Sequence, residues 1–143
     1  MVLSPIIVVI SWHKKGLKFG SDKISGLPFD WKTALRLKGA WDVSFAKWIF
    51  ETYDLFDLEP FHRILNETKE IRMAVSGDMN KIAIYAPYNT PIYVDMDLSK
   101  YDFTLINMAE RYFAKPDIIC EENVSIINAY DFNCDVLLLG RIR

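Results

Sequence analysis

Residues 91–98 read Pro-Ile-Tyr-Val-Asp-Met-Asp-Leu, and this stretch decides the expected fold. Apolar residues stand at every second position, and the positions between them hold Tyr93, Asp95 and Asp97. In a β-strand, successive side chains point to opposite faces of the sheet. The pattern therefore predicts a strand with one face on the core and the other in water, which is typical of antiparallel sheets.

Further strands are predicted on both sides of this stretch. Short apolar runs on its N-terminal side are joined by a polar turn that contains Gly77 and Asp78, which predicts a hairpin. An apolar run near the N-terminus predicts a buried first strand, and the last strand is strongly apolar. With the opening stretch, the expected strands cover residues 5–11, 71–75, 81–86, 91–98, 124–130 and 135–142.

Helical patterns lie between these strands. Asp42 can cap a helix over 43–57, in which apolar side chains recur at spacings of three and four. A second short helix is expected to open at Pro60, where proline occupies its favoured first position. A third is expected to follow Ser99 as its cap. Residues 31–38 fit a short helix and also a half-buried strand, with a slight preference for the helix.

The order of elements predicts an α+β fold. We expect a mainly antiparallel sheet of about five to six strands with three to four helices packed on it. No repeat, low-complexity tract or Ser/Gly linker marks a boundary, so residues 1–143 are expected to form a single globular domain. Apolar residues make up 51% of the chain and charged residues 25%, which favours a folded protein over a disordered one.

The N-terminal apolar run does not read as a targeting segment. It lacks a basic region and a small-residue cleavage site, and it is far too short to span a bilayer. We therefore expect a cytoplasmic protein that makes no contact with a membrane. Cys120 and Cys134 form no CxxC pair and have no neighbouring histidine, so we expect buried thiols, with a disulfide as the alternative.

Motifs for catalysis or cofactor binding are not recognisable. The chain has no HExxH, calcium loop, GxSxG, P-loop or GxGxxG, so we expect no metal and no cofactor. The remaining candidates are His13, His62 and the Lys-rich loop over 13–30. Used as acid and base, they would define a small nuclease- or transferase-like enzyme. The enzyme class stays open, but exposed, inactive histidines are the preferred interpretation, and we expect no catalytic residue.

Charge is segregated along the chain. Residues 1–50 hold eight Lys/Arg against three Asp/Glu, and residues 51–143 hold nine against sixteen. The basic third contains Trp12, Phe19 and Trp31 among its lysines, which would suit an accessory nucleic-acid-binding domain. The acidic majority of the chain would repel a polyanion, so nucleic acid is the less favoured partner.

The acidic residues predict a partner-binding surface instead. They are grouped in a run before residue 60, in the alternating stretch, and in an expected turn at 121–122. Carboxylates speed association with a basic protein and exclude wrong partners, while tyrosine supplies contact area. An ordinary solubilising surface is the alternative. The candidate binding residues are Tyr93, Asp95, Asp97, Glu121, Glu122, Asp54 and Asp57.

A short, mildly acidic α+β chain with 14% aromatic residues and no catalytic signature resembles the small bacterial immunity proteins, including those of contact-dependent growth inhibition. The resemblance covers overall character, with Tyr93, Asp95 and Asp97 fitting the acidic faces of such proteins. It implies a non-enzymatic protein that occludes the active site of a cognate basic toxin, such as a nuclease. The expected partner is then a protein toxin, with no small-molecule cofactor.

Overall fold

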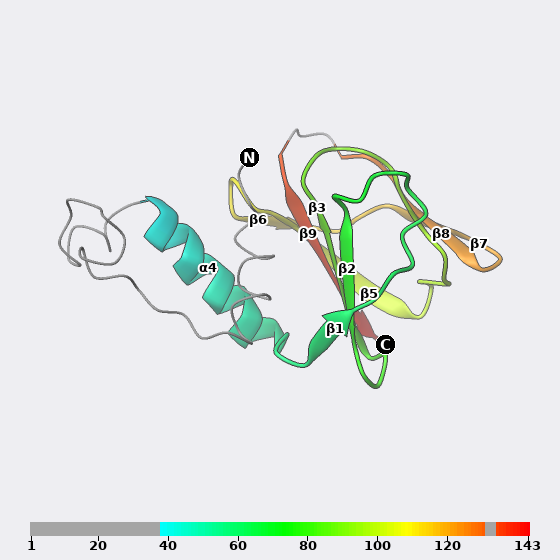
Figure 1. The fold of residues 1–143 in the computed structure, drawn as a ribbon, viewed down its shortest axis with the longest axis horizontal. Helices are drawn as coiled ribbons and strands as arrows, with labels where there is room; N and C mark the ends of the chain where they lie inside the picture. Colours follow the sequence, from blue (N-terminus) through cyan, green and yellow to red (C-terminus); the bar gives the residue numbers. More distant parts are fainter. Residues whose placement is uncertain (1–37, 131–133) are drawn as a thin grey trace. The chain divides into compact units, whose positions relative to one another are not determined.

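The computed structural model describes residues 38–130 and 134–143 (Figure 1). Side chains are described from residue 42 onward. The chain divides into two units, Met1–Phe56 and Asp57–Arg143, and each is described by itself. The strand expected over 5–11, the Lys-rich loop over 13–30 and nearly all of residues 31–38 lie outside the described residues.

The first unit contains the helix α4, Lys38–Tyr53. The sequence predicts this helix over 43–57, so its existence is confirmed although its ends differ. The helix stops where Asp54 adopts a left-handed backbone with φ of 53°, and the N–H of Leu55 donates to the carbonyl of Phe50 at 3.0 Å. A left-handed residue followed by this backward hydrogen bond is the Schellman motif, which satisfies carbonyls that the helix end leaves open.

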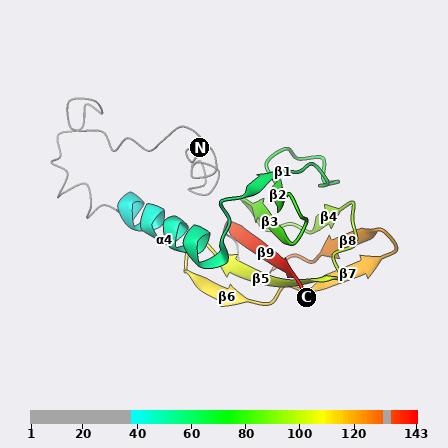
Figure 2. The ribbon, with the colours of Figure 1, turned by 90° about the horizontal axis from the view of Figure 1, so that it is seen from below.

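The second unit contains two antiparallel sheets (Figures 1 and 2). The six strands of the large sheet lie in the order β1-β2-β3-β9-β5-β6. The three strands of the small sheet lie in the order β4-β8-β7. Their bounds are Leu58–Pro60 for β1, Arg72–Ser76 for β2, Lys81–Ala86 for β3, Ile92–Val94 for β4, Tyr101–Asn107 for β5, Tyr112–Ala114 for β6, Ile118–Glu121 for β7, Val124–Ile127 for β8 and Val136–Ile142 for β9.

One hydrophobic core joins the two sheets. Ile84 on β3 and Leu138 on β9 belong to the same buried cluster as Ile92, Val94 and Ile127 of the small sheet. Sheets that bury one face against each other form the two-layer architecture of all-β domains. The core of this unit therefore lies between the large and the small sheet.

The C-terminal strand β9 lies in the middle of the large sheet, between β3 and β5. Leu138 points into the shared core, whereas Leu137 and Leu139 point to the opposite face and are 1% and 5% exposed. A strand that is buried on both faces needs no polar alternation. This explains why residues 136–139 read as an unbroken apolar run.

This architecture corrects the expected α+β fold with three to four helices packed on one sheet. The described residues form nine strands in two sheets and a single helix. Residues 61–65, expected as a helix after Pro60, run extended beside the sheets, and the N–H of Phe61 donates to the carbonyl of Met73 at 3.0 Å. Hydrogen bonds to neighbouring strands replace those within a helix, so the local helix-opening signal at Pro60 does not decide the structure.

The helix expected after Ser99 is wrong for a second reason. Residues 101–107 form β5, in which Tyr101, Phe103 and Leu105 alternate into the core. The same segment also places apolar residues three and four apart, so its pattern fits both periods. Seven register pairs with β9 select the strand.

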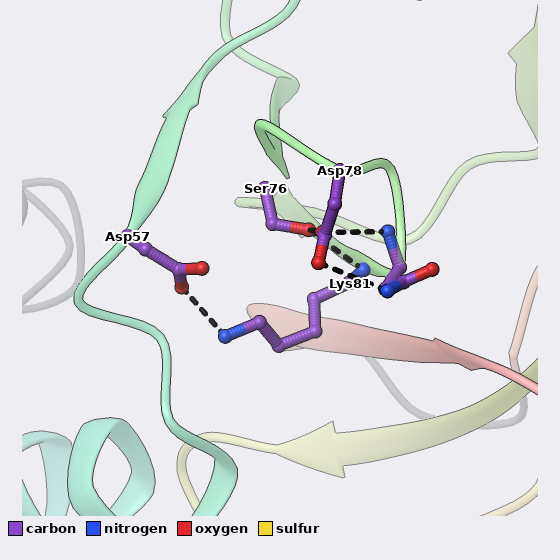
Figure 3. Close-up of polar contacts among 5 residues, drawn as sticks. Asp57, Ser76, Asp78 and Lys81 are labelled. Carbon is purple, nitrogen blue, oxygen red and sulfur yellow. Dashed lines mark hydrogen bonds and ion pairs between the residues drawn. The ribbon is translucent and has the colours of Figure 1, made fainter.

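The hairpin expected over 71–75 and 81–86 is confirmed as β2 and β3. Its turn is held by side chains, as Figure 3 shows. The hydroxyl of Ser76 donates to Oδ1 of Asp78 at 2.6 Å, and the N–H of Asn80 donates to the same oxygen at 3.1 Å. These hydrogen bonds, that of Ser76 first, hold the pKa of Asp78 below its usual value. The expected turn chemistry at Gly77 and Asp78 therefore has a direct structural basis.

Candidate protein-binding surface

The small sheet has an inner and an outer face, set by the alternation in β4. Ile92 and Val94 are fully buried in the core, whereas Tyr93 between them is 43% exposed. The orientation of these residues confirms the inward and outward assignment predicted for the first half of residues 91–98. Tyr93 therefore marks the outer face of the small sheet.

Residues 63–65 extend this sheet beyond β4. The N–H of Leu65 donates to the carbonyl of Tyr93 at 2.8 Å, and the N–H of Asp95 donates to the carbonyl of Arg63 at 2.7 Å. Ile64 forms an antiparallel bridge with Val94 and packs against the core. Since Ile64 points inward, Arg63 and Leu65 belong to the outer face.

An apolar row crosses this outer face. In the register of the strands, Tyr93 lies opposite Ile126 of β8, and Ile126 lies opposite Ile119 of β7. Leu65 lies beside Tyr93 on the other side. Residues opposite one another on one face are in side-chain contact range. We call Leu65, Tyr93, Ile126 and Ile119 the outer stripe; Leu65 and Ile119 are 53% and 45% exposed, and Ile126 is half-buried.

Charged residues flank the outer stripe. On one side, a guanidinium nitrogen of Arg63 lies 3.5 Å from a carboxylate oxygen of Asp95, and both side chains are about half exposed. Glu121 lies on the same side, at the end of β7. On the other side, Asp117 accepts a hydrogen bond from the amide of Asn128 at 2.6 Å. An apolar centre with a charged rim is the usual anatomy of a protein interface.

Three of the predicted binding residues therefore lie on one face: Tyr93, Asp95 and Glu121. Glu122 lies in the turn between β7 and β8, with a left-handed φ of 53°. The strand expected over 91–98 ends at Val94, so the expected place of Asp97 on the strand face of Tyr93 is wrong, and Asp97 lies beyond β4 and is half-buried. Hydrogen bonds from the side chain and the backbone N–H of Ser99, the latter at 2.9 Å, hold the pKa of Asp97 below its usual value.

The two remaining predicted residues, Asp54 and Asp57, belong to different units. Asp54 belongs to the first unit, where it ends the helix α4. Asp57 accepts a hydrogen bond and ion pair from Nζ of Lys81 on β3 at 2.6 Å (Figure 3). Within the second unit, the carboxylate of Asp57 is therefore engaged with β3 of the large sheet and does not belong to the outer face of the small sheet.

The sequence did not predict Arg63, Leu65, Ile119 or Ile126 as part of the surface. Residues 63 and 65 fell in an expected helix, and no strand was expected at 118–121. The signal that could have located β7 is the pair of β-branched residues Ile118 and Ile119, bounded by Pro116 and by acidic turn residues.

Of the two candidate catalytic histidines, only His62 lies in the described part of the chain. His62 is exposed, and His13 lies outside the described residues. Cys120 and Cys134 are both free thiols, but Cys120 is exposed, so the expectation of two buried thiols is wrong; burial raises the pKa of the half-buried Cys134. In the described part of the chain, no group of three or more His, Cys, Asp or Glu is placed to hold a metal ion.

Among the described residues, no helix is both long enough and apolar enough to cross a membrane.

Comparison with known proteins gives a fold but no family. No family model and no curated protein matches the chain. A solved structure of a glycoside hydrolase is similar, with a TM-score of 0.60 and 16% sequence identity over 90% of this chain. The match covers 31% of that protein, so this chain spans about a third of its length. At this identity, the likeness shows the fold alone.

Proposed function

We propose that this chain is a non-enzymatic protein-binding domain that docks its partner on the outer face of the small sheet. The observation that supports the proposal is the outer stripe, in which Leu65, Tyr93 and Ile119 are each close to half exposed and Ile126 of β8 lies between Tyr93 and Ile119. Contiguous apolar side chains with a charged rim mark interaction sites, whereas scattered ones do not.

The stripe can supply binding free energy. Fully covering one large apolar side chain contributes about 1.5–3 kcal/mol, and about half of that remains for a side chain that is already half covered. Tyrosine is among the residues that most often dominate interfaces, because its ring adds contact area at little entropic cost. Tyr93, in the middle of the stripe, is therefore the expected anchor.

The charged residues around the outer stripe indicate the charge of the partner. Arg63 neutralises Asp95, which leaves Asp117, Glu121 and Glu122 as the carboxylates at the β7 side of the face. Opposite charges steer a partner toward the face and exclude wrong partners. The partner favoured by this distribution is a basic protein that presents an apolar patch between its Lys or Arg side chains.

The toxin-neutralising role implied by the resemblance to immunity proteins stays a prediction, since no comparison bears on it. The α+β character that contributed to that resemblance is wrong for this chain. The proposed binding of a basic protein rests on the outer face alone.

The glycoside hydrolase with a similar fold suggests a second candidate, a sugar-binding accessory domain. Sugar rings pack their C–H faces on aromatic rings. The outer stripe combines one aromatic side chain, Tyr93, with three aliphatic ones. Aliphatic neighbours fit a protein surface better than a sugar, so the protein partner is preferred.

The test is a calorimetric titration of the purified chain with the basic proteins encoded beside its gene. Tyr93→Ser is compared with Tyr112→Ser, a matched control whose side chain on the large sheet is 46% exposed. We expect Tyr93→Ser to weaken binding by about tenfold or more and the control to leave it unchanged. Equal effects of the two substitutions, or binding of oligosaccharides in place of proteins, would overturn the proposal.

A further inference from the structure

The two edges of the small sheet differ. At the β4 edge, residues 63–65 add backbone hydrogen bonds, and Asn66 closes the end. Its amide donates to the carbonyl of Pro91 at 2.8 Å and accepts from the N–H of Tyr93 at 2.9 Å. At the other edge, β7 pairs with β8 on one side and with no other strand of the described chain.

The register shows which backbone groups of β7 face outward. The N–H of Asn128 donates to the carbonyl of Asp117 at 3.0 Å, so these two residues form a hydrogen-bonded pair. Such pairs alternate along an antiparallel ladder. Ile119 and Glu121 therefore direct their backbone groups to β8, whereas Ile118 and Cys120 direct theirs to the open edge.

The open edge is protected by charge and by the shortness of β7, which has four residues. Other common devices are a lysine on the edge, a proline within it, a bulge or a covering loop. The regular register of β7 contains no bulge, and Pro116 precedes the strand without entering it. Ile119 and Cys120 are exposed. Among the described residues, the edge is therefore open to pairing with a strand whose charge complements its carboxylates.

We propose that β7 accepts an extended segment of the partner as an additional antiparallel strand. The inference rests on the proposed function, because the added strand would widen the outer face and cover Ile119 at the end of the outer stripe. Backbone hydrogen bonds to Ile118 and Cys120 supply affinity that does not depend on sequence, and side chains on the outer face supply specificity.

Charge selects the chemistry of the added strand. Residues 116–130 contain three carboxylates and no Lys, Arg or His. Asp117 and Glu121 lie on the outer face on either side of Ile119. Opposite charges across a strand pair are favourable. The partner segment is thus expected to carry a basic, an apolar and a basic residue at alternate positions.

A second copy of this chain is the less suitable occupant. If two β7 strands paired antiparallel about Ile119, Asp117 of each copy would lie opposite Glu121 of the other. Like charges directly opposite each other are destabilising. The same carboxylates that attract a basic strand therefore oppose self-association along this edge.

The probe is the peptide Ser-Lys-Thr-Ile-Thr-Lys-Ser, which places isoleucine opposite Ile119 and the lysines opposite Asp117 and Glu121. Its two threonines would donate their N–H groups to the carbonyls of Ile118 and Cys120. A matched peptide with both threonine nitrogens methylated keeps every side chain but removes these donors. We expect the unmethylated peptide to slow hydrogen exchange at the amides of Ile118 and Cys120 in the full chain, and the methylated peptide to bind about tenfold more weakly or not at all.

A pair of variants tests the same edge from the protein side. Cys120→Pro removes an outward N–H and leaves the ladder to β8 intact, whereas Cys120→Ala keeps that N–H and loses the same thiol. We expect Cys120→Ala to bind the peptide like the parent chain and Cys120→Pro to lose binding, with both unfolding at denaturant midpoints close to that of the parent. If Cys120→Pro does not fold, the methylated peptide alone decides.

Four outcomes overturn the inference. These are equal binding of both peptides, no binding of either, equal binding by the two Cys120 variants, and concentration-dependent dimers with protection of Ile118. If Tyr93→Ser still weakens partner binding while the edge variants do not, the face binds the partner without an added strand. A failure of the proposed strand addition at β7 can therefore be distinguished from a failure of the proposed function.

Discussion

The large sheet and the small sheet share one core but differ in their second faces. On the large sheet, Leu137 and Leu139 lie on the second face and are buried. On the small sheet, Tyr93 and Ile119 lie on the second face and are close to half exposed. Apolar side chains on the second face are therefore covered in one sheet and accessible in the other, and the proposed partner binding concerns only the accessible ones.

The largest expected loss of stability comes from a substitution in the buried core. Leu138→Ala removes a fully buried side chain from the core between the sheets. Lost burial and the cavity left behind are expected to lower the free energy of unfolding by about 2–5 kcal/mol. The matched change on the exposed face, Ile119→Ala, should cost no more than about 0.5 kcal/mol. Urea unfolding measures both, and similar losses would contradict the comparison.

The next effect comes from overfilling the same core. Gly140 on β9 lies opposite Phe103 on β5, and a Cβ at Gly140 would come within 2.6 Å of the Phe103 ring. Phe103 is buried and has little room to move, so Gly140→Ala should destabilise the chain by about 1–3 kcal/mol. Gly77→Ala is the control, because nothing lies within 4 Å of its added Cβ. The prediction fails if the two alanines shift the thermal midpoint equally.

A smaller effect is expected at the closed edge of the small sheet. Asn66→Ala removes two hydrogen bonds, one to the carbonyl of Pro91 and one from the N–H of Tyr93. Since the site is exposed, the loss of stability should be about 1 kcal/mol. Hydrogen exchange at the Tyr93 amide should become faster, while exchange at Ile126 in the middle of the sheet stays slow. An unchanged rate at Tyr93 would show that Asn66 does not close this edge.

The smallest effect concerns pH and the β2–β3 turn of the large sheet. Because the pKa of Asp78 is lowered by folding, its contribution to stability is present above the unfolded value of 3.8 and is lost as the pH falls through the folded value. Asp78→Asn should therefore flatten the decline of the thermal midpoint below this pH. If the decline is equally steep in the variant, the Ser76 and Asn80 hydrogen bonds do not favour the ionised carboxylate.

Local patterns predicted the elements whose periodicity is unambiguous. The hairpin of β2 and β3 and the alternation of Ile92, Tyr93 and Val94 follow from the sequence because one face is buried and the other is not. The alternation also located the centre of the candidate surface. The rest depends on contacts between residues far apart in the sequence.

Pairing between strands far apart in the sequence explains why β5 and part of the outer stripe were not predicted. Tyr101–Asn107 fits a helix and a strand by its spacing, and only β9 selects the strand. Leu65 and Ile119 are separated by more than fifty residues, and they reach one row only because β4 and β8 lie between them. Sequence patterning assigns a residue to a face of its own strand, but it does not say which strands are neighbours.

We propose that the exposed second face of the small sheet binds a basic protein. An amide chemical-shift footprint on the isotope-labelled full chain, recorded when such a protein is added, tests this proposal. We predict that the perturbed amides group over residues 63–65, Tyr93, 118–121 and 124–126. Perturbations confined to Asp57 and the β2–β3 hairpin that it contacts, or to the large sheet around Tyr112, would contradict the proposal.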